Sequence, residues 1–214
     1  MTPLVHFASV SRVFNAGTTT AALDLSFDIS PLARIALIGR SGSGKTTILN
    51  LVAGLDHPTK GEVTWPGLAV PLRPTQIAVA FQGLSLIPWL TIEENVALAL
   101  QVSDQIANQK LVADALSRFD VDKVGRKLPE EVSGGQAQRV ALARAIVTRP
   151  KLLLADEPSG QLDRPTAHRT IEALLSWADE AGAGLLVATH DPEIAGALQT
   201  IWSLDHGRLV EIPR

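Results

Sequence analysis

Residues 39–46, GRSGSGKT, combine three glycines with a lysine and a threonine at a spacing that could bind phosphate groups. They match the pattern G-x-x-x-x-G-K-[ST] and lie between an apolar run and a helix-forming run, which is the context that this pattern requires. The glycines would allow backbone N–H groups to turn inward around phosphate oxygens. Lys45 would place its charge on the outer phosphates, and Thr46 would offer a hydroxyl to Mg²⁺. We therefore expect a nucleotide phosphate site here.

The apolar run at 152–155 ends in two adjacent carboxylates, Asp156 and Glu157. The first carboxylate could hold Mg²⁺ through water, and the second could orient or deprotonate an attacking water. Such an ending is common when it stands alone, but together with a phosphate loop it predicts a nucleotide hydrolase.

Two adjacent glycines, Gly134 and Gly135, precede a helix-forming run that begins at Gln136. Glycine costs a helix about 1 kcal/mol relative to alanine, so the pair needs a reason. One explanation is a capped helix start, because Ser133 is a favourable N-cap residue and glycine is tolerated beside it. The other is that bare N–H groups at a helix start bind phosphate. These residues alone favour the cap, and the rest of the chain favours phosphate.

Strands and helices must alternate along the chain to position these stretches. Short apolar runs predict strands on both sides of the phosphate loop. The predicted strands are residues 4–14, 23–30, 34–38, 62–65, 77–81, 152–155 and 185–189, with a final hairpin at 200–204 and 208–212. The predicted helices are residues 46–53 and 166–181, and the chain between 82 and 147 is mostly helical. This order predicts an α/β core that is interrupted by a helical segment.

Composition excludes several classes of protein. The net charge is −3 and no basic stripe is present, which argues against nucleic acid as a partner. The chain has no cysteine, so disulfides and thiolate metal sites are excluded. No run approaches the roughly 20 apolar residues that a membrane helix needs, and the N-terminus lacks a signal-peptide pattern. Any association with a membrane would therefore need a partner.

Six motifs in a fixed order resemble the nucleotide-binding domain of ABC ATPases. After the phosphate loop come Phe81-Gln82, VSGGQ at 132–136, Asp156-Glu157, SGQLD at 159–163 and Thr189-His190-Asp191. The resemblance covers nearly the whole chain, and VSGGQ differs from the usual LSGGQ signature only in its first residue. It implies an α/β P-loop NTPase (RecA-like) core with an antiparallel β subdomain and an inserted α-helical subdomain. One domain would span residues 1–214, with the core at 1–82 and 149–214 and the helical subdomain at 83–148.

The resemblance also assigns roles to single residues. It implies ATP binding at Gly39, Arg40, Ser41, Gly42, Ser43, Gly44, Lys45, Thr46 and Thr47, with Phe14 stacking on adenine in place of the family's usual tyrosine. Ser133, Gly134, Gly135 and Gln136 of a second subunit would close over the γ-phosphate. The implied catalytic residues are Glu157, His190 and Gln82, and the implied Mg²⁺ residues are Thr46, Gln82 and Asp156. Asp163 would line the dimer interface.

Two protein partners follow from the resemblance, while the branch of the family stays open. A second ATPase subunit, expected to form a homodimer, would share two ATP molecules. A membrane permease would dock near residues 83–95, where LSLIPWL is apolar. The resemblance thus implies a cytoplasmic protein that is peripheral on the inner face of the cell membrane through this partner. ADEPSGQLD at 155–163 is similar to the lipoprotein-release, macrolide-efflux and cell-division branch (LolD/MacB/FtsE-like), which we favour. The short segment from Lys45 to Gln82 and IPWLT at 87–91 are more similar to nitrate and sulfonate importers. A non-transport ABC ATPase is the third alternative.

Overall fold

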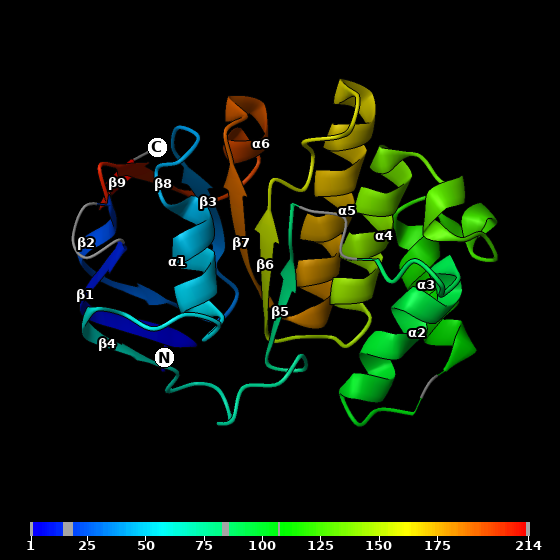
Figure 1. Ribbon diagram of the computed structural model, residues 1–214, viewed down its shortest axis with the longest axis horizontal. Helices are drawn as coiled ribbons and strands as arrows, with labels where there is room; N and C mark the ends of the chain where they lie inside the picture. Colours follow the sequence, from blue (N-terminus) through cyan, green and yellow to red (C-terminus); the bar gives the residue numbers. More distant parts are fainter. Residues whose placement is uncertain (1, 15–18, 83–85, 107, 213–214) are drawn as a thin grey trace.

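A six-stranded sheet forms the centre of the computed structural model, which describes residues 2–14, 19–82, 86–106 and 108–212 (Figure 1). Its strand order is β5-β6-β7-β3-β8-β9, with β5 at Ile77–Ala80, β6 at Leu152–Asp156, β7 at Gly184–Thr189, β3 at Arg34–Ile38, β8 at Thr200–Asp205 and β9 at Arg208–Ile212. All neighbours pair in parallel except β8 and β9. The carboxyl ends of β6, β7 and β3 therefore meet at one edge, where open parallel sheets bind ligands.

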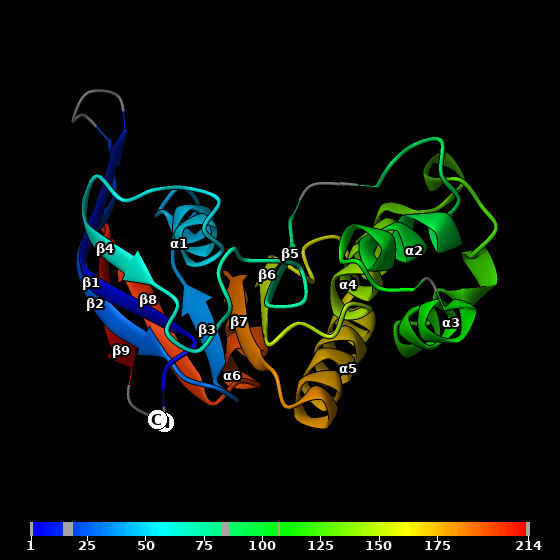
Figure 2. The same ribbon diagram turned by 90° about the horizontal axis from the view of Figure 1, so that it is seen from below.

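Alternate residues of the central strands enter two separate cores. Leu152 and Leu154 of β6 pack in the same cluster as helix α1 (Lys45–Val52), whereas Leu153 packs in the cluster of helix α5 (Arg164–Ala181). Figure 2 shows α1 on one face of the sheet, and α5 with the short helix α6 (Pro192–Gly196) on the other. Because side chains alternate across a strand, covering both faces requires the continuous apolar runs that the sequence contains.

A second, three-stranded antiparallel sheet lies at one end of the molecule, with the order β2-β1-β4 (Figure 1). β1 spans Val5–Phe14, β2 spans Thr19–Ile29 and β4 spans Lys60–Thr64. The prediction that the second strand begins at residue 23 was wrong, because Thr19 pairs with Phe14 and Thr20 pairs with Val13. β-branched threonine favours this extended pairing, so the strand begins before the predicted residue.

The end of the molecule opposite the three-stranded sheet is helical (Figures 1 and 2). It contains α2 (Ile92–Val102), α3 (Gln109–Arg118) and α4 (Gly134–Ile146), and two short 3-10 helices at Asp122–Val124 and Pro129–Glu131 connect α3 to α4. Buried side chains of these three helices form one core with α5 and with the face of β6 and β7 that α5 covers. The described elements between residues 86 and 148 are all helical, as predicted, and the limits of the helical subdomain stay a prediction.

Helix starts account for two further differences from the sequence prediction. α5 begins at Arg164, two residues before the predicted start, because Asp163 accepts a hydrogen bond from the backbone N–H of Thr166. α6 was not predicted, although Asp191 caps it and Pro192 occupies its first turn. Both combinations are recognised start signals for helices.

Candidate functional site

The start of α1, directly after the phosphate loop, suits an anion. Gly44 has φ 105°, and a Cβ at this position would lie 2.3 Å from the carbonyl oxygen of Ala21, so glycine is required. No side chain caps α1, whereas each of the other α-helices in the described ranges begins with a side-chain cap. The first N–H groups of a helix have no intrahelical acceptor, so an uncapped start beside a glycine-rich loop favours phosphate binding.

Two buried polar side chains inside the loop support the same conclusion. Lys45 Nζ donates a 2.8 Å hydrogen bond to the carbonyl oxygen of Gly39 and lies 3.9 Å from Glu157 Oε1. Ser43 Oγ is buried and has no hydrogen-bond partner within the described part of the chain. An unpaired buried hydroxyl costs about 1–3 kcal/mol, and a phosphate oxygen beside it would remove that cost. The loop therefore offers a positive charge, a hydroxyl and backbone donors that fit a nucleotide phosphate.

Asp156, at the end of β6, contacts Thr46, the residue of the phosphate loop that was also predicted to bind Mg²⁺. Its Oδ2 accepts a 2.7 Å hydrogen bond from Thr46 Oγ1. Burial raises the pKa of Asp156 above its ordinary value, and the nearby Glu157 raises it further against the opposing effects of Thr46 and Lys45. Within the described residues, no group of three or more histidine or carboxylate side chains is arranged so that it could hold a metal ion by itself. Mg²⁺ needs only one or two protein carboxylates when phosphates and waters complete its shell, so Asp156 and Thr46 fit this ion.

Asp156→Asn is expected to stabilise the nucleotide-free fold while impairing Mg²⁺-dependent hydrolysis. Because the pKa of this carboxyl is raised by folding, the ionised form costs stability at pH values above its titration range. Asparagine removes the charge and still accepts the hydrogen bond from Thr46. Urea unfolding at neutral pH should give the variant the higher free energy of unfolding, with the difference shrinking as the pH falls through the pKa of Asp156. An equal or lower value for the variant at neutral pH would contradict the burial argument.

Glu157 is held by contacts from two neighbouring strands. Its backbone N–H donates to the carbonyl oxygen of Ala188 in β7 at 2.9 Å, and its Oε2 lies 2.9 Å from His190 Nδ1. The side chain is buried, and the backbone has φ 49°, an uncommon value for a residue other than glycine. β6 and β7 are adjacent, so the residues that follow them meet at one edge of the sheet. A fixed carboxylate beside a histidine could orient or deprotonate a water molecule.

A cavity of about 520 Å³ brings most of the predicted site residues together. It is lined by Phe14, Thr19, Thr20, Ala21, Ser41, Gly42, Gly44, Lys45, Thr46, Thr47, Gln82, Asp156, Glu157 and His190. Residues 19–21 had no predicted role, because they lie between the strands predicted at 4–14 and 23–30. Gly39, Arg40 and Ser43 belong to the loop without lining the cavity wall.

The ring of Phe14 packs against Arg12, a residue for which no role was predicted from sequence. The Arg12 guanidinium carbon lies 4.2 Å from the centre of the Phe14 ring, and Arg12 Nε donates a 2.8 Å hydrogen bond to Asp56. A cation over an aromatic face is attractive by about 0.5–1 kcal/mol at exposed sites. Arg12 therefore restrains the orientation of Phe14 at the cavity wall.

The signature residues lie outside this cavity, at the start of α4. Ser133 Oγ accepts a hydrogen bond from the backbone N–H of Gln136, and the Gln136 side chain accepts one from the N–H of Ser133. The capped helix start is thus confirmed. The cap does not use the N–H groups of Gly134 and Gly135, so phosphate binding by a second subunit stays compatible with it and stays a prediction.

Asp163, the predicted interface residue, has a local role as the N-cap of α5. Its carboxylate accepts hydrogen bonds from the backbone N–H and the hydroxyl of Thr166, at 3.0 Å and 2.9 Å. These bonds lower the pKa of Asp163. The cap explains an aspartate at this position by itself, and the role of Asp163 in a dimer interface stays a prediction.

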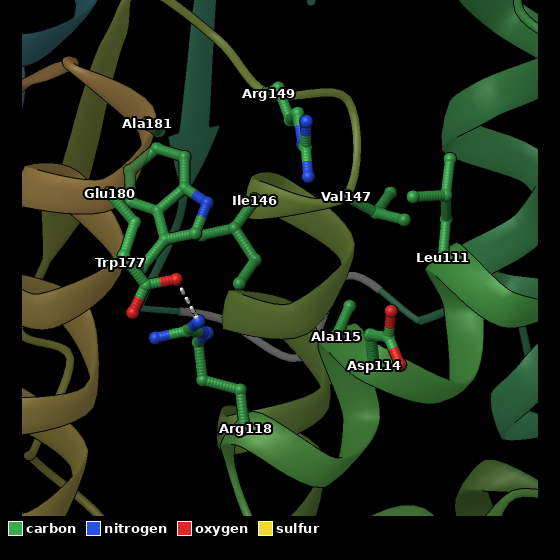
Figure 3. Close-up of a pocket in the computed structure, with 10 residues that line it drawn as sticks. All are labelled: Leu111, Asp114, Ala115, Arg118, Ile146, Val147, Arg149, Trp177, Glu180 and Ala181. Atoms are coloured by element: carbon green, nitrogen blue, oxygen red, sulfur yellow. Dashed lines mark hydrogen bonds and ion pairs between the residues drawn. The ribbon is translucent and has the colours of Figure 1, made fainter.

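A second hollow of about 290 Å³ lies between α3, α4 and α5 and is separate from the nucleotide cavity (Figure 3). Ile146 and Trp177 form part of its apolar wall, and Arg118 of α3 forms an ion pair with Glu180 of α5 at its edge. None of the predicted site residues lines it. This hollow therefore lies where helices α3 and α4 of the helical end meet α5.

The class of the protein follows from where the loop and the carboxylates meet. In P-loop NTPases the loop amides and lysine hold the β- and γ-phosphates, and a carboxylate on a nearby strand holds Mg²⁺. Here β3 leads into such a loop, and β6 delivers the carboxylate to it. The particular family is given by sequence comparison, because residues 22–160 match the model described as ABC transporter. The chain belongs to this family and is an ATP-binding domain that hydrolyses ATP.

Relatives that span most of the chain agree with this assignment. An uncharacterized ABC transporter ATP-binding protein of Mycobacterium tuberculosis is 38% identical over 97% of this chain and 89% of its own length. The lipoprotein-releasing system ATP-binding protein LolD of Chromohalobacter salexigens is 36% identical, over 94% and 91% of the two chains. The aliphatic sulfonates import ATP-binding protein SsuB 2 of Rhizobium johnstonii is 40% identical, over 98% and 80%.

A solved structure confirms the predicted fold. The dimeric ATP-binding cassette MJ0796, bound to ADP and Pi in a post-hydrolysis state, has a TM-score of 0.88 to this chain at 31% identity. The match covers 98% of this chain and 99% of that one.

Within the described ranges, no helix combines the length and the apolar character that crossing a membrane demands.

Proposed function

We propose that the chain is the motor subunit of a transporter, dimerises head to tail around two ATP molecules and moves a membrane partner. The observation that carries this proposal is that the predicted ATP-binding residues lie in two separate places on one chain. Lys45, Asp156 and Glu157 share one cavity, whereas Gly134 and Gly135 lie outside it at the start of another helix. The α4 helix of a second subunit would complete the site. ATP would then bind the closed dimer more tightly than the open one, which is the differential affinity that a ligand-driven movement requires.

Each group in the cavity has a role in this proposal. The loop residues and Lys45 bind the phosphates, and Phe14 stacks on adenine with Arg12 behind it. Thr46 and Asp156, approached by Gln82, hold Mg²⁺, which would stabilise charge on the phosphates during transfer. Glu157 orients or deprotonates the attacking water, and His190 fixes the Glu157 carboxylate. Asp163, besides capping α5, would face the second subunit.

An apolar groove beside the edge strand β5 is the surface that we assign to the membrane partner. The groove holds about 300 Å³ and is lined by Pro74, Ile77, Ala78, Val79, Phe81, Leu98, Ala99, Val102, Arg144, Ala145 and Thr148. Phe81 and Val102 expose 38% and 65% of their surface, an unfavourable state for apolar side chains that a partner helix would relieve. The groove adjoins the docking segment that was predicted at residues 83–95. In that segment Leu86 is buried in the core and Trp89 is 78% exposed, while residues 83–85 lie outside the described part of the chain.

The transport type that we propose is efflux, lipoprotein release or division, on the strength of ADEPSGQLD at 155–163 and the similarity to LolD. The alternative is a nitrate or sulfonate importer, which IPWLT at 87–91 and the similarity to SsuB 2 favour. In both cases the permease would hold the chain on the inner face of the cell membrane.

The docking proposal is tested by a matched pair of substitutions. Val102→Asp places a carboxylate in the apolar groove, and Val210→Asp places the same group on β9, where the valine is similarly exposed at 62%. Tagged proteins are incubated with ATP and detergent-solubilised membranes of the source organism, and captured proteins are identified by mass spectrometry. We expect Val102→Asp to lose the membrane partner and Val210→Asp to retain it, because a carboxylate resists desolvation against an apolar helix. Equal recovery would contradict docking in this groove.

The same capture identifies the transport type. A partner with few membrane spans and a large extracytoplasmic domain would support efflux, lipoprotein release or division. A permease with many spans would support the importer alternative. Capture of no integral membrane protein by either form would argue for a non-transport role.

A further inference from the structure

Gln138 is a buried amide that connects α4 to the chain segment after Glu157. Its side chain is 6% exposed. Nε2 donates a 2.6 Å hydrogen bond to the carbonyl oxygen of Glu157, and Oε1 accepts a 3.0 Å hydrogen bond from the backbone N–H of Gln161. A buried amide with both ends paired fixes the relative position of the two segments that it joins, because breaking either bond leaves a polar group unpaired.

The backbone of Glu157 needs such a contact. Its φ of 49° is sparsely populated for a residue with a side chain, and such values persist only when the surroundings enforce them. The N–H of Glu157 is held by Ala188, and its carbonyl oxygen accepts hydrogen bonds from Gln138 and from the N–H of Gly160. These bonds fix the two peptide planes from which the side chain extends. The direction of the carboxylate toward His190 therefore depends in part on Gln138.

The segment that Gln138 holds also packs directly against the start of α4. A Cβ at Gly134 would lie 2.4 Å from Oε1 of Gln161, and a Cβ at Gly135 would lie 3.0 Å from the carbonyl oxygen of Gln161. The absence of side chains at these two positions allows the close approach. Because the contact at Gly135 is with backbone, a displacement of the α4 start toward this segment requires the backbone at Gln161 to move, whereas the Gln161 side chain beside Gly134 can rotate away.

We propose that Gln138 is a positioning residue for hydrolysis, which fixes the backbone of Glu157 and makes the alignment of its carboxylate depend on the position of α4. The consequence for the dimer rests on the proposed function, in which α4 closes over the ATP of the second subunit. When α4 meets that ATP, Gln138 transmits the contact to Glu157 of its own subunit. Each site would thus be coupled to the other through Gln138, together with the packing of the α4 start against Gln161.

Two substitutions of Gln138 and one control test this role. Gln138→Met keeps the length of the side chain and removes both hydrogen bonds, whereas Gln138→Glu keeps the acceptor for Gln161 and removes the donor to Glu157. The control is Thr170→Val, because Thr170 is also buried and its hydroxyl donates to the carbonyl oxygen of Thr166, within α5. For each protein we would measure ATP binding at equilibrium, the rate of single-turnover hydrolysis, the amount of ATP-bound dimer, and the unfolding midpoint.

Both Gln138 variants are expected to hydrolyse ATP about tenfold or more slowly while their dissociation constants for ATP change by less than about twofold. The ATP-bound dimer should accumulate, because only alignment for hydrolysis is impaired. Thr170→Val should lower the unfolding midpoint without changing the rate per folded protein. Hydrolysis within about twofold of wild type in both Gln138 variants, or an equal loss in the Thr170 control, would overturn the proposal.

The result is separable from a failure of the proposed function. If Glu157→Gln is inactive while both Gln138 variants are active, the positioning role alone is wrong. If Glu157→Gln itself turns over normally, the catalytic assignment of Glu157 is wrong, and the positioning role of Gln138 is wrong with it.

Discussion

Glu157→Gln is expected to bind ATP as the wild type does and to hydrolyse it about 10²- to 10⁴-fold more slowly, the usual contribution of a positioned general base. Glutamine has the same shape but no basic oxygen, so it cannot take a proton from water. Glu157 is 6% exposed, and its Oε2 lies 2.9 Å from His190 Nδ1, so the substitution leaves the packing of the site intact. Because the step after ATP binding is blocked, an ATP-bound dimer should accumulate.

The measurement is a pair of experiments on one preparation. Equilibrium binding of a fluorescent ATP analogue should give similar dissociation constants for wild type and variant, and release of phosphate should differ by the expected factor. Size-exclusion chromatography with light scattering would report the dimer. Near-normal phosphate release would remove Glu157 from its proposed role, whereas lost binding would show that glutamine disturbs the fold of the site.

Lys45→Ala is expected to weaken ATP binding by about ten- to a hundredfold, since hydrogen bonds to a charged group contribute about 1.5–3 kcal/mol. Lys45 Nζ donates to the carbonyl oxygen of Gly39 and is directed into the loop that surrounds the phosphates. Alanine removes the charge while α1 keeps its length, because alanine is the most favourable residue for a helix.

Lys123→Ala is the matched control for this experiment, because Lys123 is an exposed lysine in a short 3-10 helix outside the cavity. Isothermal titration with ATP and Mg²⁺ should show weak binding for Lys45→Ala and unchanged binding for Lys123→Ala. Wild-type affinity in the Lys45 variant would contradict the phosphate-loop assignment.

The phosphate loop and the carboxylate pair could be predicted from sequence because their chemistry needs neighbouring residues in a fixed order. Gly44 to Thr46 must turn and then start a helix, and Asp156 must follow a buried strand; both requirements are local. Gln82 and His190 have no such local pattern, and only the resemblance to a family pointed to them. The structure places all of these residues around one cavity, while their catalytic roles stay predictions.

Gln138 and Arg12 could not be predicted, because their partners are distant in the sequence. Gln138 bonds to a residue 19 positions away, and Arg12 bonds to one 44 positions away. Nothing near either residue indicates those contacts, which depend on how α4 meets β6 and on where the loop before β4 lies. The order of the strands in the large sheet could not be derived from local periodicity for the same reason.

The paired glycines at 134 and 135 change how substitutions of the signature should be interpreted. A Cβ at Gly135 would lie 3.0 Å from the backbone carbonyl oxygen of Gln161 in the same chain, before ATP or a second subunit is involved, whereas at Gly134 it would meet only the movable end of the Gln161 side chain. Inactivity of Gly135→Ala therefore reports two effects at once, a shifted segment behind Glu157 and a changed surface toward the nucleotide. A mutational scan across this motif would assign both losses to ligand contact, although part of the loss at Gly135 comes from packing within a single subunit.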